Sequence, residues 1–505
     1  VGPAPGGELR ALLVLPVVLP LLGAGLSLAL GHWPALQRAL GIAVLGATLA
    51  ACVALLAQVE AGGVAVVQVG GWVAPIGITL VADLFAAIML VVSTAMVLAV
   101  LVYAIGSPGT HDESLFFHPL YLVLTAGVSA SFLTGDLFNL FVAFEVMLTA
   151  SYVLITLGAT RAQVRSGMTY VVISLVASLL FVTAVGLIYA ATGTVNMADL
   201  AGKVAGLPDG VRTALGLLLL IVFGIKAAIF PLFFWLPDSY PTAPAPVTAI
   251  FAGLLTKVGV YAIIRTQTLL FPTDGGPSGL LLAIAGATMV VGVLGAIAQD
   301  DVKRILSFHI VSQIGYMVLG LGLFSVAGIA GAIFYIVHHI VVKTSLFLVS
   351  GLLENATGSA ALRRVGGMLR RAPVMAVLFL VPALSLAGLP PFSGFVAKLA
   401  LVQAGLDLGA YTIVAVSLVV SLLTLFSMTK IWAGVFWGTA EEEPPLESAR
   451  GTGRLSSPPL MVGATASLVV VSLVISVAAG PLWDLSGRAA AALIDPAPYV
   501  QAVLG

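Results

Sequence analysis

The sequence predicts an all-α polytopic membrane protein with fourteen transmembrane helices. Of its 505 residues, 60% are hydrophobic and only 8% are charged, whereas soluble domains carry about 25% charged residues. The apolar residues gather in segments long enough to cross about 30 Å of hydrocarbon as helices. Prolines interrupt two of these segments, which predicts broken helices. The segments leave no stretch for a soluble domain of useful size.

The fourteen predicted spans follow one another through short connections. They lie near residues 11–31, 39–59, 77–106, 115–134, 137–157, 168–191, 211–236, 243–265, 279–298, 302–324, 327–353, 374–402, 409–437 and 460–480. An even number of spans places both chain ends on one side of the membrane. The chain then divides into helices 1–3 (1–110), two five-helix units (111–270 and 275–437), and a last helix with a tail (438–505).

Loop charges predict the orientation of these spans, because cytoplasmic loops carry an excess of Lys and Arg. Loops after odd-numbered spans hold eleven such residues, namely Arg38, Arg161, Arg165, Lys303, Arg304, Arg363, Arg364, Arg370, Arg371, Arg450 and Arg454. The opposite side holds five, namely Arg10, Lys203, Arg212, Arg265 and Arg488. This difference predicts that both termini lie outside the cell.

The middle of the chain shows signs of an internal repeat. Asp136 and Asp301, 165 positions apart, each open a predicted span. Each five-helix unit, spans 4–8 and spans 9–13, also contains one proline-broken span that carries a lysine. Paired broken segments at matching positions of two halves indicate a transport site.

The ionisable residues within the spans are mostly lysines. All fourteen arginines fall in loops or near span ends, whereas five of the seven lysines fall within spans: Lys226, Lys257, Lys343, Lys398 and Lys430. Among the acids, only Glu145 lies well inside a span. A charge at the bilayer centre costs about 2.5–3.5 kcal/mol on insertion scales. Because lysine can lose its proton when buried and arginine cannot, this distribution predicts a protein that handles protons.

Glu145 and Lys226 are the first pair of candidate proton-transfer residues. Lys226 lies five residues before Pro231, so we expect the helix to break beside the charge. Carbonyls freed by a break are tolerated in lipid only against protein or a water-filled cavity. We interpret the pair as a proton-coupled switch. The alternative is a structural ion pair between two helices.

The remaining candidates for proton transfer are Lys257, His339, Lys343 and Lys398. Lys257 lies at mid-span, where it could exchange a proton with the Lys226 region through water; the alternative is a lysine that snorkels to the interface. His339 and Lys343 are four residues apart, so they share one helix face. Lys398 follows the break at Pro390–Pro391 and would be the terminal proton site of the second unit.

Three further residues are secondary relay candidates: His309, His338 and Lys303. Alternatives remain for two of them, since His338 could be a packed polar residue and Lys303 an anchor at a span end. A metal site at the histidines is a poor alternative, because no cysteine or carboxylate stands nearby in sequence. Asp83 and Asp136 are expected to cap helix starts.

Several long motifs resemble those of a known family. The segments WLPDSYPTAPAPVTAIFAGLLTKVGVY, QDDVKRILSFHIVSQIGYM, HHIVVKTSLF and GLPPFSGFVAK resemble signatures of proton-translocating, antiporter-like membrane subunits. Such subunits occur in respiratory complex I, membrane-bound hydrogenases and Mrp cation/proton antiporters. FLTGDLFNLFVAFEVMLTASYVLI, followed by TGTVNMADLA, is most similar to the D subunits of Mrp-type antiporters. The similarity covers about residues 10–480.

The resemblance implies fourteen helices with two inverted five-helix repeats and broken helices 7 and 12. It also implies that Glu145 and Lys226 form an acid–lysine pair and that Lys257 is a connecting lysine. His339 and Lys343 would continue a hydrated axis, and Lys398 would be the lysine of the second broken helix. Tyr335 departs from a related pattern that has histidine there, so one relay step could differ. Lys398 separates the chain from complex I subunits that have glutamate at this place.

We therefore expect a subunit of a multisubunit sodium (or potassium)/proton antiporter in a bacterial plasma membrane, driven by the proton-motive force. Its partners would be other subunits, Na⁺ or K⁺, protons and membrane lipid, with no cofactor and no metal. The zero net charge gives no indication of nucleic acid. The main alternative is a proton-pumping subunit of a complex I-like or hydrogenase complex. Two others are an inert structural subunit and an independent transporter of organic solutes.

Overall fold

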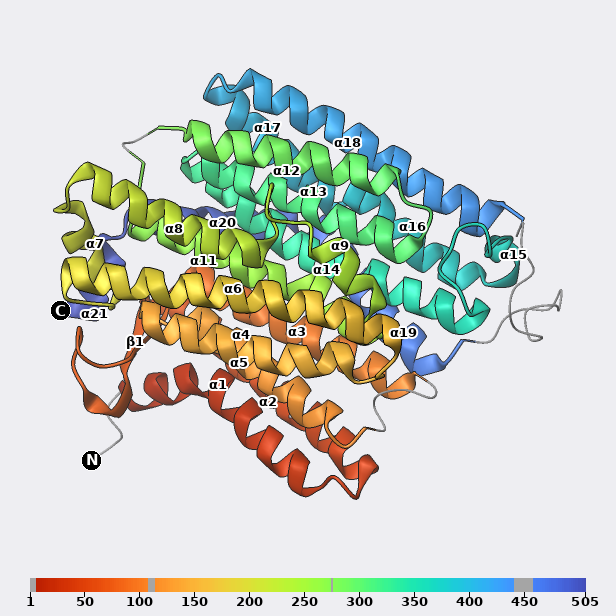
Figure 1. The fold of residues 1–505 in the computed structure, drawn as a ribbon, viewed down its shortest axis with the longest axis horizontal. Coiled ribbons are helices and arrows are strands. Elements are labelled where there is room, and N and C mark those ends of the chain that lie inside the picture. The colour runs from red at the N-terminus through yellow and green to blue at the C-terminus, as the bar shows by residue number, and fades with distance from the viewer. Residues whose placement is uncertain (1–5, 108–113, 274–275, 440–456) are drawn as a thin grey trace.

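The computed structural model describes residues 6–107, 114–273, 276–439 and 457–505. Most helices lie side by side along the long axis of the molecule (Figure 1). The first two helices form one edge of this array and α18 the opposite edge, while α1 begins and α21 ends at the same end of the molecule (Figure 1). Arg450 and Arg454, which contribute to the predicted orientation, lie outside the described residues.

The N-terminal part holds three long helices and a small hairpin. Its elements are α1 (Gly6–Ala29), α2 (Pro34–Gly62), β1 (Ala65–Gln68), the 3₁₀ turn η1 (Val69–Gly71), β2 (Thr79–Ala82) and α3 (Leu84–Gly106). The strands pair antiparallel with Ala65 opposite Ala82. The sequence prediction of a span from residue 77 is therefore wrong at its start, because residues 79–82 pair with β1 and Asp83 caps α3 through Ala86 N–H at 2.9 Å.

The region predicted as the first five-helix unit contains α4 to α11. Its elements are α4 (Phe117–Leu133), α5 (Leu137–Thr156), α6 (Arg161–Thr192), α7 (Met197–Ala205), α8 (Asp209–Ala227), α9 (Leu236–Ser239), the 3₁₀ turn η3 (Tyr240–Thr242), α10 (Ala245–Ile250), the π-helical turn η4 (Phe251–Leu255) and α11 (Thr256–Leu269). The last three form one continuous helical run, so the predicted span at 243–265 corresponds to α10–α11.

The region predicted as the second unit and the C-terminal part continue the array. Their elements are α12 (Gly279–Ile297), α13 (Val302–Gly322), α14 (Val326–Thr357), α15 (Met368–Arg371), α16 (Pro373–Ala387), α17 (Ser393–Asp407), α18 (Tyr411–Trp432), the π-helical turn η5 (Ala433–Trp437), α19 (Pro459–Val477), α20 (Ala479–Ile494) and α21 (Ala497–Leu504). The helices α20 and α21 follow the last predicted span and were not predicted.

Twelve helices in the described ranges are long and apolar enough to cross a membrane. Two shorter apolar helices, α4 and α16, accompany them. The protein is thus predominantly helical and multi-pass, as the sequence predicts.

α14 lies at the centre of the molecule. Its most apolar window is entirely buried, and it packs against α3, α13, α16, α17, α19 and α20. Polar side chains on α14 are therefore enclosed by protein.

Two helix pairs meet closely at glycines. A Cβ added to Gly127 of α4 would lie 2.6 Å from Met147 N of α5, and one added to Gly292 of α12 would collide with Ser312 N of α13. The two close approaches are 165 positions apart. The backbone bridges Asp136–Asn196 and Asp301–Ala361 repeat with the same offset.

Candidate functional site

Lys226 lies where α8 ends. The helix stops at Ala227, and Ala228 adopts a left-handed conformation with φ of 58°. Lys226 is therefore in the last turn, where the carbonyl end of the helix dipole favours a cation. Its side chain is buried, and Nζ lies 5.1 Å from the centre of the Phe144 ring. The predicted break beside the charge is confirmed.

Glu145 and Lys226 meet through a third residue. The Ser178 hydroxyl on α6 donates a hydrogen bond to Glu145 Oε1 on α5. Lys226 Nζ donates to the same hydroxyl oxygen at 3.4 Å. The structure thus brings the predicted pair together, but a serine separates the two charges. Sequence reasoning missed Ser178, although its spacing of four from Ser174 placed both hydroxyls on one helix face.

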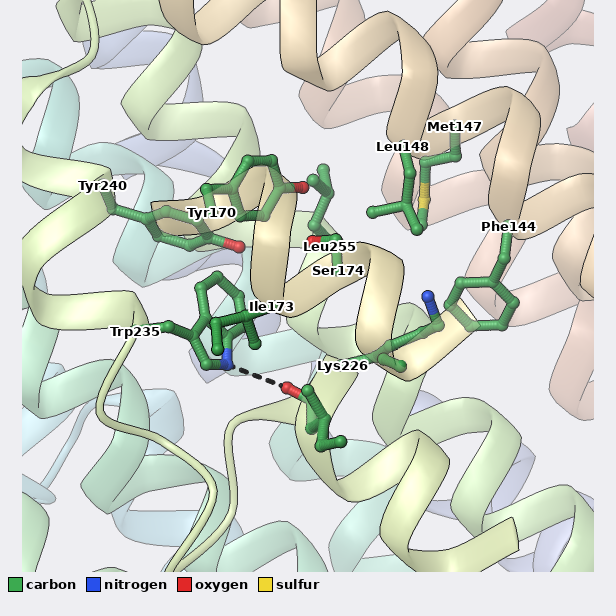
Figure 2. Close-up of a pocket in the computed structure, with 12 residues that line it drawn as sticks. Phe144, Met147, Leu148, Tyr170, Ile173, Ser174, Lys226, Trp235, Tyr240 and Leu255 are labelled. Carbon is green, nitrogen blue, oxygen red and sulfur yellow. Dashed lines mark hydrogen bonds between the residues drawn. The ribbon is translucent and has the colours of Figure 1, made fainter. Parts of the chain in front are cut away.

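A small cavity adjoins Lys226, with a volume of about 20 Å³. That is room for about one water molecule. Figure 2 shows Lys226 extending toward Phe144, with Tyr170, Ser174 and Tyr240 across the cavity. Trp235 closes one side and donates its indole N–H to Ile225 O at 3.0 Å.

Lys257 is fully buried beside the π-helical turn of α10–α11. A π turn displaces the regular bonding of a helix and often marks a functional position. Here Lys257 Nζ donates to Ala252 O at 2.5 Å and to Thr256 Oγ1 at 3.1 Å. Lys257 therefore does not snorkel, since its own helix supplies its partners inside the core.

The polar face of α14 carries the predicted His339 and Lys343, both fully buried. Within the described part of the chain, neither ring nitrogen of His339 nor Lys343 Nζ has a hydrogen-bond partner. The Tyr335 ring stacks over His339 at 6.4 Å, and its hydroxyl donates to Gln313 Oε1 of α13. Such orphaned polar groups need partners of their own, which water can provide.

Lys398 lies after the break of the second broken helix. α16 ends at Ala387, Gly388 adopts φ of 86°, and α17 begins at Ser393. Lys398 reaches back across the break, where Nζ donates to Leu386 O at 3.0 Å, Ala387 O at 3.1 Å and Ser421 Oγ at 2.9 Å. Carbonyls at the end of α16 thus hold the ammonium group. Lys226 lies before its break, so the two lysines occupy opposite sides of the two interruptions.

The secondary candidates have individual partners. His309 Nε2 lies 2.9 Å from Ser427 Oγ, and His338 Nδ1 lies 2.8 Å from Ser393 Oγ at the start of α17. His338 thus contacts the second break. Lys303 forms an ion pair of 2.6 Å with Glu354 and is buried rather than an exposed anchor.

Charged residues near span ends have structural partners. Lys430 donates to Asp300 at 2.8 Å, and this hydrogen bond together with the lysine charge lowers the pKa of the Asp300 carboxyl. Asp136 caps α5 by accepting from Asn139 N–H at 2.7 Å, as predicted.

Asp83 has a second role that sequence reasoning missed. Besides capping α3, it forms a buried ion pair with Arg265 of α11 at 2.7 Å. Tyr261 accepts a hydrogen bond from Arg265 at 3.1 Å, and the ring of Tyr499 on α21 lies 5.2 Å from the guanidinium. The pair ties α3, α11 and the C-terminal helix together. A separation of 182 positions between Asp83 and Arg265 left no local signal of it.

In the described ranges, no group of three or more His, Cys, Asp or Glu lies together in a way that could hold a metal ion. The buried basic residues lie on α8, α11, α14 and α17, at Lys226, Lys257, His339, Lys343 and Lys398. Hydroxyls, carbonyls and aromatic rings surround Lys226, Lys257 and Lys398.

Comparison with known proteins connects this geometry to a family. Residues 134–424 match the family model described as NADH:quinone oxidoreductase/Mrp antiporter, TM. The D subunit of the Na(+)/H(+) antiporter of Alkalihalophilus pseudofirmus is 46% identical, over 98% of this chain and 99% of that protein. A chain of the Mrp complex from Dietzia sp. superposes with a TM-score of 0.91 at 38% identity, over 99% of this chain and all of that one.

A chain of the membrane-bound sulfane sulfur reductase, an archaeal respiratory membrane complex, is also similar. It superposes with a TM-score of 0.89 at 26% identity, over 98% of this chain and all of that one. The matched region contains Glu145, Lys226, Lys257, Lys343 and Lys398. The chain belongs to the NADH:quinone oxidoreductase/Mrp antiporter membrane-subunit family, and within it the chain is similar to the D subunits of Mrp-type antiporters.

Proposed function

We propose that this chain is the proton-translocating subunit of a multisubunit monovalent cation (Na⁺ or K⁺)/proton antiporter in a bacterial plasma membrane. The observation that carries the proposal is the series of buried bases from Lys226 through Lys257, His339 and Lys343 to Lys398. Such groups are costly inside a membrane and mark proton relays. Similarity to the D subunit of a Na(+)/H(+) antiporter and to a chain of an Mrp complex supports the coupling to a cation.

The proton path would begin at Glu145 and Lys226. Proton uptake would change their charges, and the change would pass through Lys257, His339 and Lys343 to Lys398. His309 and His338 would act as secondary proton relays, since each contacts a serine hydroxyl within the second unit. Lys303 would influence the proton path through the charge of its ion-pair partner Glu354, without carrying protons itself.

The architecture we propose for this function has fourteen spans and two inverted repeats. The twelve long apolar helices and the shorter α4 and α16 together make fourteen. The 165-position offset of the glycine contacts and backbone bridges supports the repeat. Equivalent helices of the two units are five spans apart. Because five is an odd number, equivalent helices would cross the membrane in opposite directions. Both termini would lie outside the cell.

The test uses inside-out vesicles that contain the chain with its co-purifying partners. An acid interior is imposed, sodium or potassium is added, and the pH gradient is followed. Collapse of the gradient on cation addition is expected. Glu145→Ala and Lys226→Ala should each abolish the collapse while the complex still assembles, and retained activity in either would refute the proposed path.

A redox-driven proton pump is the second candidate, supported by the similarity to the respiratory sulfane sulfur reductase. The same buried residues would then serve an electron-transfer reaction in partner subunits. Vesicles that fail to exchange cations but transfer electrons would favour this candidate.

A further inference from the structure

We propose that the Ser178 hydroxyl is a proton relay between Lys226 and Glu145. The inference rests on the proposed function and deepens it. Ser178 lies on α6 and is buried, with 6% of its surface exposed. It contacts both partners, because it donates to Glu145 Oε1 and accepts from Lys226 Nζ at 3.4 Å. In the described part of the chain, no ion pair joins Glu145 to Lys226 directly.

The hydroxyl has the chemistry that a relay needs. A serine hydroxyl has one hydrogen to donate and two lone pairs to accept. In one step, an Nζ–H bond of protonated Lys226 breaks and its proton joins Ser178 Oγ, while the original hydroxyl proton moves to Glu145 Oε1. The products are a neutral amine, an intact serine and a neutral carboxylic acid. The net result is the transfer of one proton, and no co-reactant is required.

The contacts of Ser178 differ from those of two threonines on α6. Serine and threonine in helices often donate to the carbonyl four residues earlier. Thr183 does so with Leu179 O at 2.7 Å, and Thr192 with Ile188 O at 2.7 Å. Ser178 instead donates to another helix. Its neighbours Leu175, Val176 and Leu179 are exposed on the outer face of α6. Ser178 lies on the opposite, buried side together with Tyr170 and Ser174, which we call the inward stripe of α6.

The repeat offset gives an independent argument. Positions 165 residues after Tyr170, Ser174 and Ser178 are Tyr335, His339 and Lys343. This offset is the one that relates the glycine contacts and the backbone bridges. The inward stripe of α6 thus matches the polar face of α14. Ser178 occupies in the first unit the place that an ionisable side chain occupies in the second.

The test compares three variants of the assembled complex in membrane vesicles: Ser178→Ala, Ser178→Thr and Thr183→Val. Ser178→Ala removes the relay and is expected to lower the antiport rate by about 100-fold, the lower end of the effects of positioned proton transfer. Ser178→Thr keeps a hydroxyl and should retain most of the rate. Thr183→Val removes an exposed hydroxyl from the same helix and should behave as the unmodified chain.

A second readout is independent of transport. The infrared absorption of a protonated carboxyl can be assigned to Glu145 by its loss in Glu145→Gln. Because the Ser178 hydroxyl donates a hydrogen bond to Glu145, the frequency of this absorption should change in Ser178→Ala and return to its original value in Ser178→Thr. An unmodified complex without antiport would refute the proposed function, yet this absorption would still test the contact of Ser178.

Two outcomes would overturn the relay. One is a Ser178→Ala complex with normal antiport and an unchanged carboxyl absorption. The other is Ser178→Thr that is as inactive as Ser178→Ala while both assemble and melt like the unmodified complex. The latter would show that the shape of serine, and not its hydroxyl, is what the site requires.

Discussion

Each buried lysine of the series has a different set of neighbours at the residue scale. Lys226 contacts a hydroxyl and an aromatic ring, Lys257 a carbonyl and a hydroxyl of its own helix, and Lys398 two carbonyls and a hydroxyl. Lys343 faces the Phe347 ring at 5.7 Å. None of the four forms an ion pair with a carboxylate among the described residues, so their partners are hydroxyls, carbonyls and aromatic rings.

Replacing Lys226 by arginine tests whether charge or proton release matters. Arginine keeps the positive charge but effectively never releases its proton in proteins. Lys226→Arg should therefore lose antiport in vesicles although the complex assembles. Lys203→Arg is the matched control, since the Lys203 side chain is 45% exposed and pairs with Asp199 at 2.9 Å. Normal transport by Lys226→Arg would show that Lys226 acts only as a fixed charge.

The sequence identified the ionisable residues but not the groups that hold them. A lysine or glutamate within an apolar span stands out by its charge. Ser178, Ser421 and Gln313 do not, because neutral polar residues are common in spans and only their three-dimensional contacts distinguish them. Figure 2 shows how residues of α5, α6 and α8 converge around one cavity.

At the scale of elements, the broken helices were predictable and the geometry of each break was not. Prolines and lysines located both interruptions in the sequence. Which side of the break a lysine occupies depends on where the helix resumes. α8 is followed by irregular chain up to α9, whereas only residues 388–392 separate α16 from α17. Lys398 therefore reaches back across the break to the last carbonyls of α16. Lys226 cannot reach back in this way, because it lies before its break, within α8 itself.

The second break depends on a close approach at Gly394. A Cβ added there would overlap Ser385 O, a clash that forces α17 away from α16. Gly394→Ala should therefore displace Lys398 from its carbonyls and lower both the melting temperature and antiport. Gly186→Ala is the control, because nothing lies within 4 Å of that Cβ and alanine favours helix by about 0.5–1 kcal/mol.

The Asp83–Arg265 pair should be a strong link between elements. Asp83→Asn leaves the buried guanidinium uncompensated, which typically costs about 3–5 kcal/mol, so the purified complex should melt at a clearly lower temperature. Asp209→Asn breaks the exposed pair with Arg212, and such pairs contribute about 0–1 kcal/mol. Equal melting of the two variants would contradict the stabilising role of the buried pair.

At the scale of the whole molecule, the order of the long helices followed from hydrophobicity alone. The hairpin β1–β2 and the helices α20 and α21 did not, because short elements outside the long apolar segments carry no comparable pattern. The contact of Tyr499 with Arg265 joins residues 234 positions apart, and no local feature predicts such a pairing.

The orientation of the chain in the membrane can be tested with two cysteines placed at opposite ends of α6. The lone Cys52 is buried and is first replaced by alanine. Ala162→Cys and Ala205→Cys then place exposed thiols at the start of α6 and beyond its end. A membrane-impermeant maleimide added to intact cells should label Ala205→Cys but reach Ala162→Cys only after permeabilisation. The reverse pattern would place both termini in the cytoplasm.

The balance of charge along the interior limits how many protons it can hold. The proposed series contains four buried lysines and one half-buried glutamate, Glu145, so full protonation of the lysines would leave three uncompensated positive charges. Two unit charges 10 Å apart repel by on the order of 1–2 kcal/mol at an effective dielectric constant near 20. On the proposed path, an arriving proton would therefore disfavour the proton ahead of it. Repulsion between neighbouring protonated groups would therefore couple the uptake of a proton at one end of the series to the release of a proton at the other end.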